Sequence, residues 1–166
     1  MMRDIIKKDH KVIENPSLNI VLYQPEIPAN TGNIARLCGA AGIRLHLIHP
    51  LGFRVDDKHL KRAGLDYWQE VDIRHHINFD DFSEKEKVNP KNLASFSKYA
   101  SMTYTKAEIK FGDYLLFGQE TQGLPLYIRK KYNSYRIPIW GNVRSLNLAT
   151  AVGIVAYHYM HELKLF

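Results

Sequence analysis

With 166 residues, the chain is long enough to bury a full hydrophobic core and is predicted to form one domain. Hydrophobic residues make up 45% of the sequence and charged residues 24%, which is typical of a globular protein and excludes a largely disordered one. The net charge of +6, from 23 basic and 17 acidic side chains, allows an anionic partner such as RNA without requiring one.

A single cysteine, Cys38, rules out a disulfide or a cysteine-based metal site within one chain. Residues 1–17 are polar, lack the apolar core of a secretory signal and are predicted to form a loosely held N-terminal arm. Residues 18–166 are then expected to form a single domain. The apolar stretches are too short to span a bilayer, so we expect a cytoplasmic protein without a membrane partner.

The domain opens with a strand, a helix and a second strand. Residues 18–23 are rich in branched side chains and predict a buried strand. Asn30 or Thr31 can cap a helix that runs to about Ala41, and residues 43–48 alternate like the next strand. This order within about thirty residues is a βαβ unit, which predicts a parallel pair of strands.

The rest of the chain continues this alternation. A short basic helix is expected from Asp56 or Asp57 to Gly64. Further strands are predicted around residues 68–73, 93–97, 114–117 and 135–139. Further helices are predicted around residues 80–87 and 125–131, and from about Ser145–Asn147 to the end. The pattern predicts an α/β fold with a mostly parallel sheet flanked by helices.

Polar residues follow the strands in three places. In the first polar stretch, residues 30–36, the simple alternative to a site is that Asn30 caps a helix and Arg36 is solvated. In the second, residues 117–125, Glu120 lies in a glycine-containing loop that can approach a ligand, or merely faces water.

The third polar stretch, residues 137–148, leads from a strand into the last helix. Ser145 and Asn147 are residue types that favour helix caps, and Arg144 beside them is a candidate exposed cation. Capping and ligand binding are compatible, because ligands of α/β proteins bind at the carboxyl ends of strands against the next helix.

Several common site motifs are absent from the sequence. There is no dinucleotide-binding glycine fingerprint, phosphate-binding P-loop or hydrolase nucleophile elbow. The histidine pairs His75-His76 and His158/His161 occur without an H-E-x-x-H motif. We therefore expect no metal site.

Taken together, the three polar stretches resemble the three motifs of the SPOUT methyltransferases, in the branch that methylates ribose 2′-hydroxyls. Residues 19–38, 44–48 and 61–67 look most like the bacterial tRNA (cytidine(34)-2′-O)-methyltransferase family. The match runs from about residue 18 to the C-terminus and rests on the order and spacing of all three motifs.

This resemblance implies a SPOUT-type fold with a deep C-terminal trefoil knot, a homodimer, and S-adenosyl-L-methionine as cofactor. Four residues fall where the family holds the cofactor: Phe96, Gly118, Ile137 and Ser145. Four match the positions that carry catalysis and site architecture: Arg36, Glu120, Ser145 and Asn147. Glu120 is expected to order its loop through backbone amides or through Asn30, which would support the site.

The implied reaction is methyl transfer to the ribose of the wobble nucleotide, a cytidine or modified uridine at position 34, in the anticodon region of tRNA. Because a guanidinium stays protonated, we expect Arg36 to hold the adjacent phosphate and stabilise the developing alkoxide. Four basic residues are candidate RNA contacts, with a solvated helix face as the alternative for the first three: Lys58, Lys61, Arg62 and Arg144. The alternative functions are ribose methylation elsewhere in tRNA or rRNA, and RNA binding without catalysis.

Overall fold

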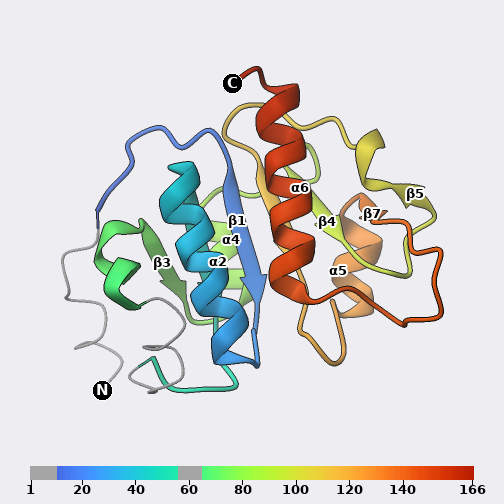
Figure 1. The fold of residues 1–166 in the computed structure, drawn as a ribbon, viewed down its shortest axis with the longest axis horizontal. Coiled ribbons are helices and arrows are strands. Elements are labelled where there is room, and N and C mark those ends of the chain that lie inside the picture. The colour runs from blue at the N-terminus through green and yellow to red at the C-terminus, as the bar shows by residue number, and fades with distance from the viewer. Residues whose placement is uncertain (1–10, 56–64) are drawn as a thin grey trace.

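The computed structural model describes residues 11–55 and 65–166, and within them the core is one seven-stranded sheet (Figure 1). The strand order is β3-β2-β1-β6-β4-β7-β5, and every strand pair in this sheet is parallel. The strands are β1 Asn19–Tyr23, β2 Arg44–Ile48, β3 Ile73–His76, β4 Leu93–Phe96, β5 Met102–Thr103, β6 Tyr114–Phe117 and β7 Ser134–Arg136. The predicted α/β fold with a mostly parallel sheet is confirmed.

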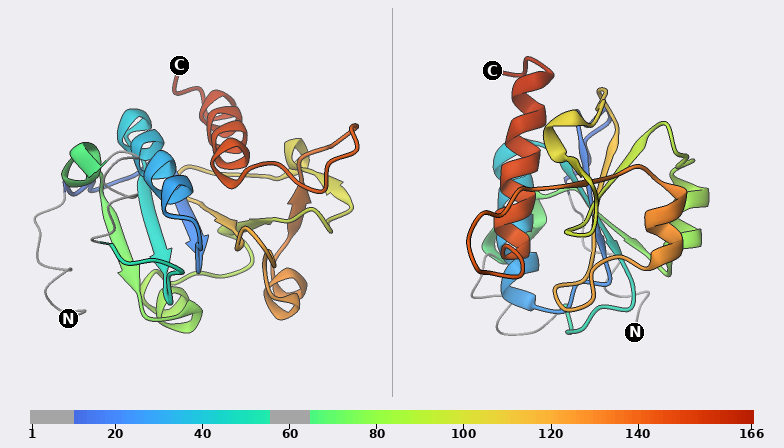
Figure 2. Two further views of the ribbon diagram at one scale, coloured as in Figure 1. Left: turned by 60° about the horizontal axis from the view of Figure 1, so that its bottom comes forward. Right: turned by 90° about the vertical axis from the view of Figure 1, so that its right-hand side faces the viewer.

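Helices cover both faces of the sheet (Figure 2). The two long helices, α2 Pro28–Ala41 and α6 Leu148–Glu162, pack side by side on one face. The shorter α4 Phe79–Lys85 and α5 Leu126–Lys131 lie on the other face. Two 3₁₀ helices, η1 Leu65–Glu70 and η2 Tyr104–Lys106, complete the elements of the described chain, in which no helix has the length and apolarity to cross a membrane.

The alternation of side chains along each strand divides the core into two layers. Ile20 and Leu22 of β1 join the larger cluster under α2 and α6, whereas Val21 joins the smaller cluster under α4 and α5. On β2, Leu45 and Leu47 face the larger cluster. His46 between them therefore faces α4, where its ring contacts Phe82.

Several predicted boundaries need correction. Helix α2 begins at Pro28, two residues before Asn30, because proline is well suited to the first helical turn. The strand predicted over 68–73 is η1 as far as Glu70, and β3 begins at Ile73. The last strand is also shorter than the predicted 135–139 and runs over Ser134–Arg136. The short β5 and η2 were not predicted, and the predicted basic helix over 56–64 lies outside the described residues.

The described part of the N-terminal arm is tied to the domain rather than loosely held. The Lys11 amide donates to the Gln69 carbonyl at 3.0 Å, and the Ile13 amide donates to Asp72 Oδ2 at 2.9 Å. Arg44 binds both Asp72, at 2.7 Å, and the Ile13 carbonyl. The buried Asp72 carboxylate needs such partners, and the arm supplies one of them.

Candidate functional site

A cavity of about 310 Å³ opens at the carboxyl ends of β4, β6 and β7, where ligands of α/β proteins commonly bind. Its walls include residues 96–99 at the end of β4, 117–121 at the end of β6, and 145–148 at the start of α6. All four residues predicted to hold a cofactor line it: Phe96, Gly118, Ile137 and Ser145. The structure thus gathers these four residues, which are spread over 49 positions from 96 to 145, around one space.

One wall of the cavity is flat and apolar. Phe96 and Phe117 stack with their ring centroids 5.0 Å apart and an interplanar angle of 18°, and both side chains are buried. Ile137 and Ile139 add aliphatic surface to the same cavity. Such a wall suits the face of a planar ring, with polar groups from the neighbouring loops to orient it.

Two glycines set the shape of the loop after β6. A Cβ placed on Gly118 would lie 2.3 Å from the carbonyl carbon of Gly123 and 2.4 Å from the amide nitrogen of Leu124. Gly123 has a φ of 67°, and its amide donates to the Gln119 carbonyl at 3.0 Å. The tight backbone approach leaves no room for a side chain at Gly118, so the peptide backbone itself faces the cavity there.

Glu120 binds the start of α2. Its carboxylate accepts hydrogen bonds from the Glu26 amide at 2.8 Å, the Ile27 amide at 3.0 Å and Asn30 Nδ2 at 3.3 Å. Ile27, the residue before α2, has no side chain that could cap the helix. Glu120 therefore supplies the acceptor and the negative charge that a helix amino terminus favours. The predicted contacts of Glu120 with backbone amides and Asn30 are confirmed.

Glu26, in the loop after β1, binds the loop that carries Glu120. Its carboxylate accepts from the Thr121 amide at 3.0 Å and from the Thr121 hydroxyl at 2.8 and 2.9 Å. The loops after β1 and β6 thus exchange hydrogen bonds in both directions. Sequence reasoning missed Glu26, because nothing local distinguishes it from an exposed carboxylate in a Pro-Glu-Ile-Pro run.

Asn147 joins the third polar stretch to the other two. Its Nδ2 donates to Asn30 Oδ1 at 2.9 Å, while its Oδ1 accepts from the Ala149 and Thr150 amides at 2.9 and 3.3 Å. The predicted cap of the last helix is confirmed for Asn147, but Ser145 lines the cavity instead and Asn30 lies within α2 rather than at its cap. A continuous chain Glu120–Asn30–Asn147 results, which we call the loop bridge.

The two predicted cations within the described residues, Arg36 and Arg144, do not line the cavity. Arg36 is exposed on α2, outside the cavity wall, with its guanidinium carbon 5.2 Å from the centroid of the Tyr67 ring. Arg144 is exposed in the loop before α6. Lys58, Lys61 and Arg62 lie outside the described residues, so the structure neither supports nor opposes their assignment to RNA binding.

One aromatic and two basic side chains that were not predicted from the sequence lie together at the rim of the cavity. Lys98 and Tyr99 line the cavity, and Tyr99 is exposed. The guanidinium carbon of Arg129 lies 4.8 Å from the Tyr99 ring centroid, and Lys98 Nζ lies 5.2 Å from it. The two cations suit an anionic ligand, and the exposed Tyr99 ring offers a face on which a flat ring of that ligand can stack.

Comparison with known proteins gives close matches over nearly the whole chain. A tRNA (cytidine(34)-2′-O)-methyltransferase of Yersinia pestis is 46% identical over 152 residues, which covers 88% of this chain and 94% of that protein. A protein of the same name from Escherichia coli K12 is 45% identical over 149 residues, with 88% and 94% covered.

Solved structures agree with these matches. A structure from a study of the 2-OH methylation of C/U34 on tRNA superimposes with a TM-score of 0.84 at 46% identity, covering 91% of this chain and 99% of that one. An AdoMet-bound rRNA methyltransferase from Sinorhizobium meliloti shares the fold, with a TM-score of 0.78 at 24% identity over 90% of this chain and 58% of its own. Residues 17–157 match the SpoU rRNA Methylase family. This chain belongs to that family.

Proposed function

We propose that the protein transfers a methyl group from S-adenosylmethionine to the ribose 2′-hydroxyl of the wobble nucleotide, position 34, of tRNA. Two relatives named tRNA (cytidine(34)-2′-O)-methyltransferase, from Yersinia pestis and Escherichia coli, are 46% and 45% identical to the chain, and the match covers 94% of each. The observation that carries the proposal is the convergence of the three polar stretches on one cavity, tied together by the loop bridge.

The residues of the cavity fit this cofactor. The stacked Phe96 and Phe117 and the nearby isoleucines offer an apolar wall for the adenine ring. The backbone at Gly118, kept free of any side chain, can meet polar atoms of the ligand directly. When bound, S-adenosylmethionine supplies an electrophilic sulfonium methyl group. The protein has to place the ribose hydroxyl in line with that methyl group and accommodate the departing proton.

Arg36 is proposed to hold the phosphate beside the target ribose and to stabilise the developing alkoxide, with the phosphate as proton acceptor. A guanidinium suits this role because it stays charged and presents a planar fork to phosphate oxygens. Within one chain Arg36 lies outside the cavity wall. We therefore propose a homodimer in which Arg36 of the partner subunit completes each site, and the exposed Ala29, Asn33 and Ala40 of α2 would permit close packing there.

The RNA partner is supported by charge and by exposed rings. The chain carries a net charge of +6, and Lys98, Arg129 and Arg144 surround the cavity mouth or the loop beside it. Trp140, in that loop, is 92% exposed and could stack on an unpaired base of the anticodon loop. Phosphate contacts of this kind make binding dependent on salt. We place the enzyme in the cytoplasm, where its tRNA substrate would be found.

The C-terminal trefoil knot remains a prediction of the family resemblance. Strand β7 lies next to the edge of the sheet, yet the chain that follows returns to place α6 against α2 and over the central strand β6. This return path past the loops at the carboxyl ends of the strands supports a knotted topology.

The test is to incubate the protein with labelled S-adenosylmethionine and tRNA from cells that lack the wobble methylation, and then to map the label. Label at the ribose of nucleotide 34 is the expected result. Label at another ribose of tRNA or rRNA would replace the substrate assignment while keeping the reaction. Cofactor binding without transfer to any RNA, or no cofactor binding, would overturn the proposed reaction.

A further inference from the structure

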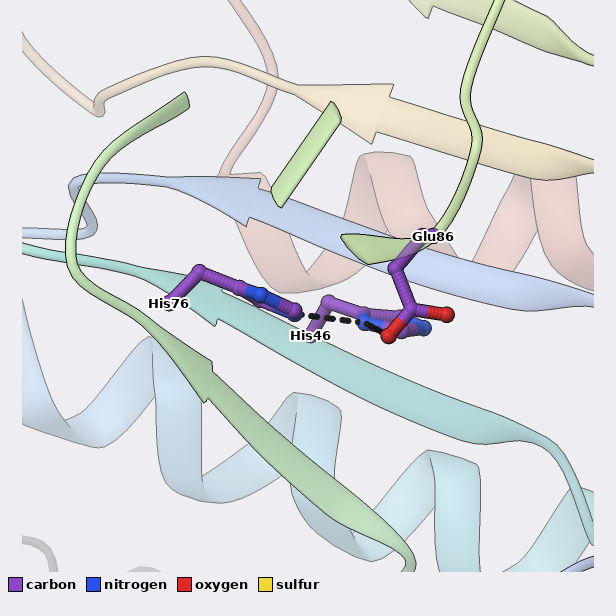
Figure 3. A group of neighbouring side chains, drawn as sticks. All are labelled: His46, His76 and Glu86. Carbon is purple, nitrogen blue, oxygen red and sulfur yellow. Dashed lines mark hydrogen bonds and ion pairs between the residues drawn. The ribbon is translucent and has the colours of Figure 1, made fainter. Parts of the chain in front are cut away.

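Two histidines and a carboxylate converge on the sheet face that α4 covers (Figure 3). His46 comes from β2, His76 from the end of β3, and Glu86 follows α4. His46 Nδ1 lies 2.9 Å from His76 Nε2 and 4.0 Å from Glu86 Oε1. One ligand atom from each residue falls within 4.8 Å of the other two, and both imidazoles are buried.

The hydrogen bonds around His46 determine where its proton lies. Asn19 donates its Nδ2 to the Gly112 carbonyl at 2.8 Å, so its Oδ1 is the atom that faces His46 Nε2, at 3.2 Å. An amide oxygen can only accept, and His46 must therefore carry its proton on Nε2. The lone pair of His46 Nδ1 then points to His76.

The same reasoning leaves one nitrogen of His76 unsatisfied. His76 has to donate from Nε2 to His46, which leaves its Nδ1 as a bare acceptor. Among the described residues this buried Nδ1 has no hydrogen-bond partner. The Asp81 carboxylate lies close to this nitrogen, with Oδ2 at 3.9 Å, but a carboxylate oxygen is an acceptor as well. Buried polar atoms without partners are rare and call for an explanation.

We propose that His46, His76 and Glu86 bind one zinc ion, which ties β2 and β3 to the end of α4. With the metal on His76 Nε2, the histidine proton moves to Nδ1 and points to Asp81, so the unsatisfied nitrogen becomes a donor facing a carboxylate. Both ligand histidines would then have an outer partner, Asn19 for His46 and Asp81 for His76, as metal-binding histidines almost always do. Imidazole and carboxylate ligands suit zinc, and water can fill the fourth position.

The surrounding charges allow such an ion. Arg74 Nη1 now binds the two oxygens of Glu86 at 3.0 and 3.3 Å, which makes Arg74 the competitor of the metal. The Arg74 side chain is 39% exposed, and its Nε lies 4.0 Å from Asp72 Oδ1. If Arg74 releases Glu86, its guanidinium therefore still has water and the Asp72 carboxylate as partners. Arg44 is paired with Asp72 at 2.7 Å, and Lys85 with Asp81 at 2.7 Å.

Burial keeps both imidazoles neutral and therefore ready to bind metal. Desolvation lowers the pKa of His76 to about 4, and it lowers that of His46 as well, helped by His76 and the two arginines. Tyr114 donates to Glu86 Oε2 at 3.2 Å, and burial beside that carboxylate raises the pKa of Tyr114 to about 12, so it remains a hydroxyl donor. Protons therefore compete weakly with zinc here.

The proposed site differs from the sequence-based expectation of no metal, which stays untested until zinc binding is measured. His46 and His76 lie 30 residues apart. They are joined by the parallel pairing of β2 with β3 rather than by any local motif. His75 and His76 are adjacent in sequence, but their side chains point to opposite faces of strand β3. His75 Nδ1 lies 2.9 Å from His49 Nε2 instead.

The test measures zinc binding by the full chain after removal of metal with a chelator. We expect one ion per chain by elemental analysis, and a Co²⁺ derivative with the visible absorption of a tetrahedral site. Loss of an outer-shell partner of a metal site typically costs about 10–100-fold in affinity, so His76→Gln and Glu86→Gln should each cost at least about tenfold. Glu86→Gln retains an acceptor for Tyr114, which makes it the variant to use if His76→Gln fails to fold.

Two further variants make the test specific. His49→Gln, in the other histidine pair, is the matched control and should leave the affinity unchanged. Arg74→Gln frees Glu86 and should tighten binding. The proposal is overturned if the native chain binds no zinc, or if binding survives His76→Gln and Glu86→Gln, disappears in His49→Gln, or weakens in Arg74→Gln.

Discussion

At the scale of single residues, Glu120 matters for both stability and activity. Glu120→Gln removes the charge and replaces one carboxylate oxygen by an NH₂ group, which cannot accept a hydrogen bond. One of the two backbone N–H groups, that of Glu26 or that of Ile27, then loses its acceptor. Hydrogen bonds to charged groups contribute about 1.5–3 kcal/mol, so we expect the free energy of unfolding in urea to fall by about that amount. Methyl transfer should fall with it, because the loop bridge loses its anchor.

The control for this prediction is Glu84→Gln, a neutralised carboxylate of exposed α4 surface. Such surface changes stay within about 0.5 kcal/mol. Equal loss of stability in the two variants would show that Glu120 acts through net charge alone, against the hydrogen-bonded role inferred from its three contacts.

The buried His76 predicts a loss of stability in mild acid for the zinc-free protein. Its pKa of about 4 in the folded state lies below the ordinary histidine value of about 6.5, so below pH 6.5 the unfolded chain binds a proton that the folded chain refuses. Stability is therefore complete above about pH 6.5 and declines as the pH falls toward about 4, by up to about 3 kcal/mol.

Urea unfolding of the metal-free chain at a series of pH values measures this decline. His76→Gln should reduce the slope between about pH 6.5 and 4, because one of the groups that take up a proton is gone, while His46, whose pKa burial also lowers, still contributes. His161→Gln, at an exposed position of α6, should keep the slope of the native chain. A slope that persists unchanged in His76→Gln would assign the effect to other groups.

At the scale of elements, the loop after β6 depends on the close approach of Gly118 to Gly123. Gly118→Ala places a methyl group 2.3 Å from backbone carbon, so the loop has to shift. We expect a destabilisation of about 1–3 kcal/mol and a larger loss of S-adenosylmethionine binding, measured by calorimetry. Gly153→Ala in α6 meets no atom within 4 Å and should fold at least as stably, because alanine favours helix over glycine.

Asn147 allows helix capping to be separated from site assembly. Asn147→Ala removes both the cap of α6 and the bond to Asn30, and a lost cap costs about 1 kcal/mol. Asn147→Asp keeps an oxygen for the Ala149 and Thr150 amides but loses the donor to Asn30 Oδ1. We expect Asn147→Asp to unfold like the native chain in urea while methyl transfer falls. Native activity in that variant would reduce Asn147 to a helix cap.

The elements that could be predicted from sequence are those with a local pattern. Buried strands such as β1 and β6, and the cap at Asn147, have signals that lie within a few residues. The strand predicted around Trp68 failed because Trp68 is buried from a 3₁₀ helix and the buried Val71 directly follows that helix. Apolar content alone does not distinguish such a segment from a strand. The two-residue β5 is too short to have a periodicity at all.

The site could be predicted only in part, because its geometry depends on strand order. The family resemblance selected Phe96, Gly118, Ile137 and Ser145, and these residues do line one cavity. Glu26 and Tyr99 were missed, since their significance comes from neighbours more than 20 residues away, Thr121 and Arg129. The cluster of His46, His76 and Glu86 could not be predicted for the same reason, because parallel pairing alone brings His76 beside His46.

At the scale of the whole molecule, the position of Arg36 raises the question of which subunit it serves. It is exposed on α2 and does not line the cavity of its own chain. If the proposed dimer places Arg36 of the partner subunit at each cavity, two defective variants should complement one another. Arg36→Ala lacks only the cation, and Gly118→Ala lacks only a functional cavity, so each alone is expected to be inactive.

Mixing the two variants, after unfolding and refolding together, distributes subunits at random. Half of the dimers are then mixed, and in each mixed dimer one of the two sites pairs an intact cavity with an intact Arg36. Activity should recover to about a quarter of that of the native enzyme. If Arg36 instead serves its own cavity, the Arg36→Ala chain lacks the cation and the Gly118→Ala chain lacks the cavity in every dimer. The mixture then stays as inactive as its components, and the assignment of Arg36 to the partner's site is wrong.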